Sequence, residues 1–151
     1  MRVAPLRPED LDAALPLLAG YQRFYGVERP DDERNRAFFS RFLAPSDDGL
    51  LLGAWLDREL VGFATLYWTF SSTRAADIAL LNDLYVAEHV RGRQVGLSLL
   101  LAAAEAARDR GLQSMEWLTH IDNRTAQRLY ERIDRVHRDA WFGYEMELRG
   151  P

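Results

Sequence analysis

Apolar and polar residues divide this chain into short segments of two kinds. Leu50 to Leu56 and Leu60 to Phe70 are typical of strands, and the polar Asp57 to Glu59 between them predicts a hairpin. Leu11 to Tyr25 and Val95 to Arg110 instead repeat apolar residues at helical spacing. Alternating strand-like and helix-like segments of this length indicate a fold of the mixed α/β class.

Proline, glycine and shorter apolar patterns define the remaining predicted elements. Pro16 should kink or split the first helix, and Gly111 should end the long one. The remaining predicted elements are a strand over 2–6, a helix from Asp31 or Asp32 to Leu43 with Phe38, Phe39 and Phe42 on its inner face, strands over 79–86 and 115–119, a helix over 123–132 and a closing strand over 141–148. The order β-αα-βββ-α-β-α-β predicts one domain over 1–151, with a mostly antiparallel mixed sheet and about four helices.

Composition narrows the class of partner. The formal net charge is -4, which argues against nucleic acid as a ligand and mildly favours a cationic substrate. Without cysteine the chain has no disulfide, thiolate metal site or cysteine nucleophile. The sequence shows no signal core and no apolar run that could cross a bilayer, so we expect a cytoplasmic protein without a membrane partner.

The most informative segment is a strand followed by a basic, glycine-containing loop and the start of a helix. Arg91-Gly92-Arg93-Gln94-Val95-Gly96 follows the strand that ends at Val86. The first N–H groups of a helix have no internal partner and carry partial positive charge, and glycine lets a phosphate approach the backbone. These features predict a phosphate-bearing ligand at 91–97, although a tight strand-to-helix turn would need the same residues.

A second segment, Asn123 to Glu131, predicts a capped helix with one buried face. Asn123 is a natural N-cap. Tyr130 lies on the apolar face, which fits a core tyrosine as well as one that takes part in chemistry.

Together these segments resemble the GNAT superfamily of acyl-CoA-dependent N-acetyltransferases. The matching elements are the strand Asp83-Leu84-Tyr85-Val86, the loop Arg91-Gly92-x-x-Val95-Gly96, and Asn123-x-x-Ala126-x-x-Leu129-Tyr130-Glu131. The resemblance covers essentially the whole chain and is strongest to the branch that acetylates small amines such as polyamines, together with some histone-acetylating members. It implies a single-domain enzyme that transfers the acetyl group of acetyl-CoA to a primary amine by direct attack in a ternary complex, without a metal.

The resemblance also implies roles for individual residues. The pantetheine arm would pair with main-chain groups of the strand, the pyrophosphate would lie on the loop amides, and Asn123 would contact the arm. Tyr130 would stand near the thioester sulfur as the general acid. The residues implied in coenzyme binding are Leu84, Tyr85, Val86, Arg91, Gly92, Arg93, Gln94, Val95, Gly96, Leu97 and Asn123.

Two positions depart from the family pattern. Gln94 replaces a glycine of the loop; at positive φ it would be strained by roughly 1 kcal/mol, but we expect negative φ, because the ligand needs only its N–H. Ile133-Asp134-Arg135 stands where the family has Leu-Gly-Phe, so the segment before the last strand is atypical.

The acceptor side is open in the sequence. An alkylamine with a pKa of about 10.4 is only about 0.04% neutral at pH 7, so a group must take its proton. Asn82 stands where polyamine-type relatives have Glu, and an amide is no base at neutral pH. Asp83 is adjacent but points to the opposite strand face. Glu28, Asp122, Glu145 or a water chain are alternatives as the base. The predicted acceptor-binding residues are Tyr21, Tyr25, Glu28, Phe70, Asn82 and Trp117, aromatic faces and a carboxylate that suit a cation.

Two other functions remain open at this point. One is a catalytically silent acyl-CoA-binding or sensing module, and the other is an acetyltransferase for lysine in protein tails. His89, His120 and His137 are too scattered for a metal site. Trp141, Phe142 and Tyr144 in the closing strand predict a homodimer through the C-terminal region.

Overall fold

The computed structural model describes residues 1–149, which divide into two compact units. The first unit is Met1–Leu118 and the second begins at Thr119. Within the described residues, no helix has the length and apolar character needed to cross a membrane.

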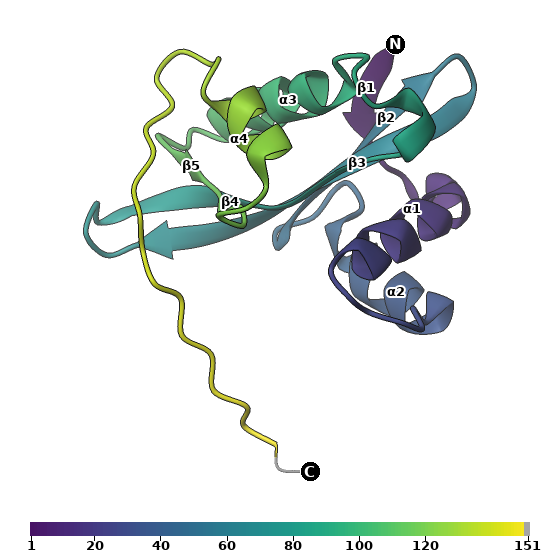
Figure 1. Ribbon diagram of the computed structural model, residues 1–151, viewed down its shortest axis with the longest axis horizontal. Coiled ribbons are helices and arrows are strands. Elements are labelled where there is room, and N and C mark those ends of the chain that lie inside the picture. The colour runs from purple at the N-terminus through teal and green to yellow at the C-terminus, as the bar shows by residue number, and fades with distance from the viewer. Residues whose placement is uncertain (150–151) are drawn as a thin grey trace. The chain divides into compact units, whose positions relative to one another are not determined.

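The first unit is built on one five-stranded sheet (Figure 1). The strands lie in the order of the sequence: β1 (Arg2–Pro5), β2 (Gly49–Leu56), β3 (Glu59–Ser71), β4 (Ala76–Val86) and β5 (Met115–Glu116). Neighbours are antiparallel except β4 and β5, which are parallel. The predicted fold class, a mixed sheet with four helices, is confirmed.

The helices of the first unit cover both faces of the sheet (Figure 1). α1 (Leu11–Phe24) and α2 (Asp32–Phe39) lie on one face and α3 (Val95–Asp109) lies on the other. Adjacent residues of β3 show this alternation: the Phe63 ring contacts that of Tyr21 on α1 at 5.8 Å, whereas a side chain at Gly62 would meet Val95 and Leu99 on α3. The site described below lies on these two faces and at one edge of the sheet.

Apolar side chains from the strands and from α1 and α2 form a core on this face of the sheet. Phe63 and Leu51 from the strands and Leu18 from α1 have no exposed surface. Phe39 and Phe42 are also buried, as predicted, but Phe38 is 41% exposed, so its predicted place on the inner face is wrong. The reason is that α2 ends at Phe39 and a 3-10 turn, Ser40–Phe42, changes the helical phase that the prediction assumed.

α1 runs through Pro16 without ending. A 3-10 turn at Pro8–Asp10 leads into it, and the buried side chains of Leu11, Ala14, Leu15 and Leu18 hold one face against the sheet. Tertiary packing therefore outweighs the hydrogen bond that proline cannot donate. Of the kink or split predicted at Pro16, the split does not occur.

Among its described residues, the second unit has one helix, α4 (Arg124–Tyr130). The closing strand predicted over 141–148 is absent: among the described residues of this segment none pairs with another strand. Its large apolar side chains are instead exposed, Trp141 by 84% and Tyr144 by 95%. Alternation of apolar residues predicts which face of a strand is buried, but a strand forms only where a neighbouring backbone pairs with it.

Candidate active site

A β-bulge in the middle of β4 sets the direction of the side chains around it. Leu81 pairs with Leu66 and Asp83 pairs with Thr65, so β4 has one residue, Asn82, with no partner on β3. The extra residue reverses the alternation of side chains along the strand. Asp83 consequently lies on the α1/α2 face, beside the predicted acceptor residue Tyr21, and its exclusion from that side by simple alternation was wrong.

Asp83 is a buried carboxylate held by neutral side chains. It is 3% exposed, Asn82 Nδ2 donates to its Oδ1 at 2.9 Å, and Tyr21 also donates a hydrogen bond to it. Burial raises the pKa of Asp83, while Tyr21, Thr65 and Asn82 act in the opposite direction by favouring the charged form. The exposed Asn82 therefore orients Asp83.

Tyrosines surround this carboxylate on the α1/α2 face. The Tyr21 ring lies 6.2 Å from that of Tyr85 and 4.9 Å from that of Tyr25. Burial first, and then Asp83, raise the pKa of Tyr21 far above its usual value. Tyr85 packs closely over α1, where a Cβ at Gly20 would come within 2.7 Å of the Tyr85 hydroxyl. The rings of Tyr21, Tyr25 and Tyr85 therefore form an aromatic cluster beside the Asp83 carboxyl group.

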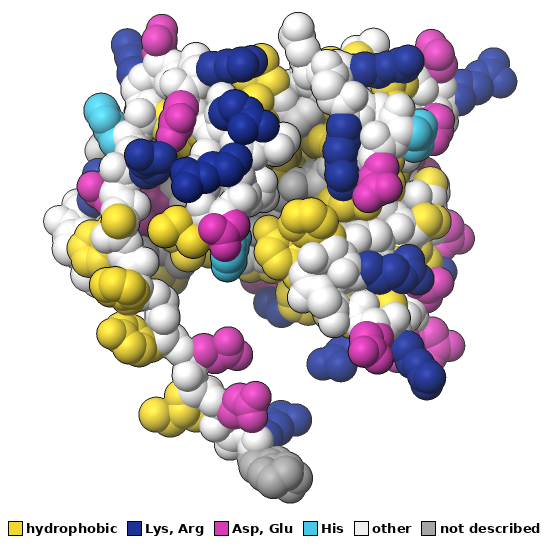
Figure 2. Space-filling model, in the orientation of Figure 1, with side chains coloured by type: hydrophobic (Ala, Val, Ile, Leu, Met, Phe, Trp, Pro, Cys, Tyr) yellow, Lys and Arg dark blue, Asp and Glu magenta, His cyan; other side chains and the backbone are white. Residues whose placement is uncertain are grey.

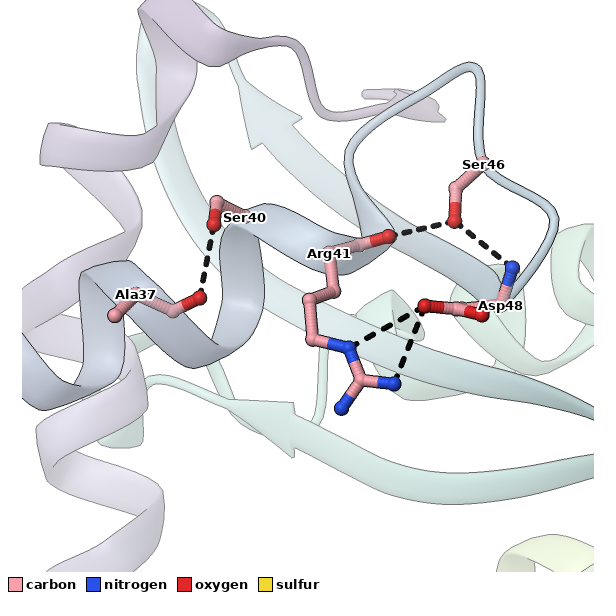
Figure 3. Close-up of polar contacts among 5 residues, drawn as sticks. All are labelled: Ala37, Ser40, Arg41, Ser46 and Asp48. Atoms are coloured by element: carbon pink, nitrogen blue, oxygen red, sulfur yellow. Dashed lines mark hydrogen bonds and ion pairs between the residues drawn. The ribbon is translucent and has the colours of Figure 1, made fainter.

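In the segment that follows α2, Arg41 and Ser46 make the polar contacts drawn in Figure 3. Arg41 donates from Nε and Nη2 to Asp48 Oδ2 at 3.3 and 3.2 Å, and Ser46 Oγ donates to the Arg41 carbonyl at 2.6 Å. Phe42, next to Arg41, stacks on Tyr67 at 5.0 Å. Burial and Asp83 raise the pKa of Tyr67 to about 12, and the Arg41 guanidinium opposes that rise.

The other predicted acceptor residues are less closely grouped. Tyr21 is half-buried, Tyr25 is 56% exposed, and Glu28 is exposed in the segment after α1. Phe70, near the end of β3, is 80% exposed. Trp117 is half-buried just after β5. Of the predicted acceptor residues, the structure brings Tyr21, Tyr25 and Asn82 to Asp83 or to its immediate neighbours.

The far edge of β4 is free after its first half. β5 pairs with β4 only at Ala79 and Leu80, and no described strand pairs with Leu81–Val86 on that side. The Ala87 N–H donates to Val61 at 2.9 Å, and since neighbouring residues of a strand point their N–H and C=O groups to opposite edges, those of Val86 and Leu84 point away from β3. This free edge can pair with an extended ligand.

In the loop after β4, the Arg91 side chain binds back to the end of the strand. Arg91 Nε donates to the Val86 carbonyl at 3.2 Å, and its guanidinium lies 5.9 Å from the Tyr85 ring centroid. Arg93 makes no ion pair with any described residue. Gly92 has φ +83° and open space where a Cβ would lie, which leaves its backbone accessible.

The start of α3 supplies N–H groups that have no partner within the helix. Gln94 is the N-cap residue, and its carbonyl accepts the first helical hydrogen bond, from Ser98 N–H at 3.0 Å. The amides of residues 95–97 precede that bond and carry the partial positive charge of the helix end. Gln94 has φ 62°, so the expectation of negative φ was wrong. The turn needs a left-handed residue to aim the chain into α3, and Gln94 adopts that conformation at a steric cost.

Asn123 and Tyr130 bound α4 in the second unit. Asn123 Oδ1 accepts the Ala126 N–H at 3.1 Å, as an N-cap does. Gln127 anchors the helix by donating to the carbonyls of His120 and Ile121 at 3.2 and 2.7 Å. Tyr130 is half-buried at the last position of α4 and has an interaction partner. In the described residues, no three His, Asp or Glu side chains come together as a metal ion would require.

Comparison with known proteins agrees with this geometry. Residues 15–134 match the model of the acetyltransferase (GNAT) family. The chain is 33% identical to YhfO, an uncharacterized N-acetyltransferase of Bacillus subtilis (strain 168). The 131 aligned residues are 87% of this chain and 87% of YhfO. This chain belongs to the GNAT family of acetyltransferases.

Two further acetyltransferases are similar to this chain, one in sequence and one in both sequence and fold. The D-amino-acid N-acetyltransferase HPA3 of Saccharomyces cerevisiae (strain ATCC 204508 / S288c) is 29% identical over 133 residues, which is 87% of this chain and 82% of HPA3. A crystal structure of a probable acetyltransferase, 33% identical, superimposes with a TM-score of 0.84 over 100% of both chains. Acetyl transfer is thus the activity of the family to which the chain belongs.

Replacing Gln94 with glycine tests the backbone of the GNAT loop. A residue with a Cβ in the left-handed conformation costs about 1–2 kcal/mol, and glycine removes this cost. Glycine also makes the unfolded chain more flexible, which offsets part of the stabilisation. Gln94→Gly should therefore raise the free energy of unfolding, measured by urea denaturation, by about 1 kcal/mol. Arg93→Gly is the matched control, since Arg93 does not have positive φ, and it should give no gain. Equal effects of the two substitutions would contradict strain at Gln94.

Proposed function

We propose that the protein transfers the acetyl group of acetyl-CoA to a primary amine of a small molecule or lysine-like side chain by direct attack in a ternary complex. The observation that carries this proposal is the free edge of β4, which runs from the Asp83 region to a loop and helix start with unpaired N–H groups. An extended thiol arm ending in a pyrophosphate has the chemistry to match both.

The chain's own groups fit the coenzyme. Main-chain groups of Leu84, Tyr85 and Val86 would pair with or border the arm, and Asn123 would contact it. The pyrophosphate would lie on the loop and first turn of α3, formed by Arg91, Gly92, Arg93, Gln94, Val95, Gly96 and Leu97. Bound acetyl-CoA supplies an acyl group already activated as a thioester. Arg93, exposed and free of ion pairs among the described residues, adds charge for the phosphates.

The acceptor would bind on the α1/α2 face. Tyr21 and Tyr25 offer aromatic faces to a cation, and Asp83 supplies negative charge behind them. Asn82, Glu28, Phe70 and Trp117 stay predicted contributors to this side. The relative HPA3 is named for acetylation of D-amino acids, which supports a small amine as the class of acceptor.

Tyr130 is proposed as the general acid. A thiol of pKa roughly 8.5 leaves more readily when it is protonated, and a tyrosine with an ordinary pKa of about 10 can donate in that step. The proton acceptor on the amine side is a separate question, because Asn82 cannot take a proton at neutral pH.

The direct test is release of free coenzyme A thiol from acetyl-CoA in the presence of a panel of primary amines and lysine peptides. We expect release with at least one small amine, and Tyr130→Phe should lower kcat on the order of 10²-fold, the usual contribution of a general acid. Coenzyme affinity, measured by calorimetry, should stay the same. Tyr144→Phe, in the exposed C-terminal segment, is the matched control and should be neutral.

The other outcomes of this assay point to other functions. Tight coenzyme binding without thiol release on any acceptor would identify a silent acyl-CoA-binding module. Release with peptides alone would identify a protein-tail acetyltransferase. An unchanged kcat in Tyr130→Phe would remove Tyr130 from the mechanism.

We further propose that two copies associate through the C-terminal segment. Phe142, Tyr144, Met146 and Leu148 alternate along it and are each at least 80% exposed, whereas Glu145 and Glu147 fall between them in the sequence. Figure 2 shows both apolar and acidic side chains along this segment. A segment whose apolar side chains alternate and whose backbone pairs with no described strand gains both burial and hydrogen bonds when it pairs with a second chain.

Light scattering at micromolar concentration should therefore give a mass of twice 17.4 kDa. Phe142→Asp combined with Tyr144→Asp should give the monomer mass, because charges on the apolar face cannot be buried without cost. Glu145→Gln on the other face is the control and should remain dimeric. A monomeric wild-type protein would reject the proposal.

A further inference from the structure

Asp83 is the only ionisable side chain that is buried among the residues the structure describes. No arginine, lysine or histidine forms an ion pair with it there, and its hydrogen-bond donors, Tyr21 and Asn82, are neutral. A buried carboxylate without a cation is costly to the folded protein. Such groups are concentrated at functional sites, where a ligand supplies the missing charge.

Two side chains connect this carboxylate with the surface. Tyr21, half-buried on α1, donates a hydrogen bond to Asp83 and also contacts the exposed ring of Tyr25. Asn82, exposed at the bulge, donates to Asp83 Oδ1. Of the two, only a hydroxyl can both accept a proton and pass one on, because an amide nitrogen has no free lone pair for a proton at neutral pH.

We propose that Tyr21 and Asp83 together accept the proton that the acceptor's ammonium group must lose before it can attack, an inference that rests on the proposed acetyltransferase function. The ammonium N–H bond breaks as its proton passes to the Tyr21 oxygen. The Tyr21 proton passes at the same time to the Asp83 carboxylate, so Tyr21 ends neutral and Asp83 ends as the acid. The freed nitrogen lone pair attacks the acetyl carbon, and Asp83 later returns its proton to water through Tyr21.

The electrostatics favour this direction of transfer. A cation and a buried anion become two neutral groups, which removes the cost of burying the charge of Asp83. Burial raises the pKa of Asp83, which makes it a stronger base than an exposed aspartate. The raised pKa of Tyr21 keeps the hydroxyl protonated, so it relays a proton and does not ionise. The other titratable or charged groups facing this pair are Tyr25, Tyr67, Tyr85 and, through Tyr67, Arg41.

The pH profile of kcat/KM separates this role from a structural one. For the amine that the wild-type enzyme acetylates fastest, Tyr21→Phe and Asp83→Asn should each lose on the order of 10²-fold at pH 7. That loss should shrink as the pH approaches the amine's own pKa, because solution then supplies the neutral amine. Tyr67→Phe, which removes a hydroxyl near Asp83 that is not hydrogen-bonded to it, is the control and should keep the wild-type profile.

Two further measurements, of coenzyme affinity and of the free energy of unfolding, show whether a variant is otherwise intact. Coenzyme affinity by calorimetry and the free energy of unfolding should be near wild type in Tyr21→Phe, which keeps the ring, so that variant tests the relay even if Asp83→Asn fails to fold. A loss that is the same at every pH, or no loss in Tyr21→Phe, would overturn the relay and leave the proposed function intact. A wild-type protein that acetylates no amine would overturn the proposed function and this inference with it.

Discussion

The site depends on where the pairing of β4 stops. On one side every residue of β4 except the bulge residue Asn82 pairs with β3, but on the other side β4 pairs with β5 at only two residues, Ala79 and Leu80. β4 lies between β3 and β5 in the sheet, but its backbone from Leu81 to Val86 is unpaired on the β5 side. Apart from the Val86 carbonyl, which accepts from Arg91, the N–H and C=O groups at this edge have no partner on a described strand and need one. An extended ligand is the partner that the GNAT family implies.

Both halves of the proposed chemistry lie at the ends of this free edge. At its start, the bulge at Asn82 turns Asp83 toward α1 and the tyrosines. At its end, Gly92 and the left-handed Gln94 lead into α3 and its unpaired amides. One strand thus separates an acidic, aromatic face suited to an amine from a positive helix end suited to a phosphate.

Much of this architecture could be predicted because it depends on local patterns. The hairpin of β2 and β3 follows from two apolar runs separated by the polar Asp57 to Glu59, and α3 follows from its apolar spacing and Gly111. The loop at 91–96 was located by its glycines and arginines. Each of these features is specified by residues close together in the sequence.

The features that could not be predicted depend on contacts between distant residues. A bulge shifts the side-chain direction by one residue and leaves no mark in the apolar pattern, so Asp83 was assigned away from the acceptor side. The clue was a carboxylate, Asp83, between the apolar runs at 78–81 and 84–86 of the strand. The φ of Gln94 depends on how the loop must join α3, and the predicted closing strand lacked a neighbour among the described residues.

Amide hydrogen exchange with and without coenzyme A tests the role of the free edge most directly. We expect the amides of Leu84 and Val86, which point away from β3, to exchange fast in the free protein and to become protected when coenzyme A binds. The Phe63 and Tyr85 amides, within the β3–β4 pairing, should already be protected. Binding of coenzyme A without a change at Leu84 and Val86 would contradict the proposal that the arm adds to β4.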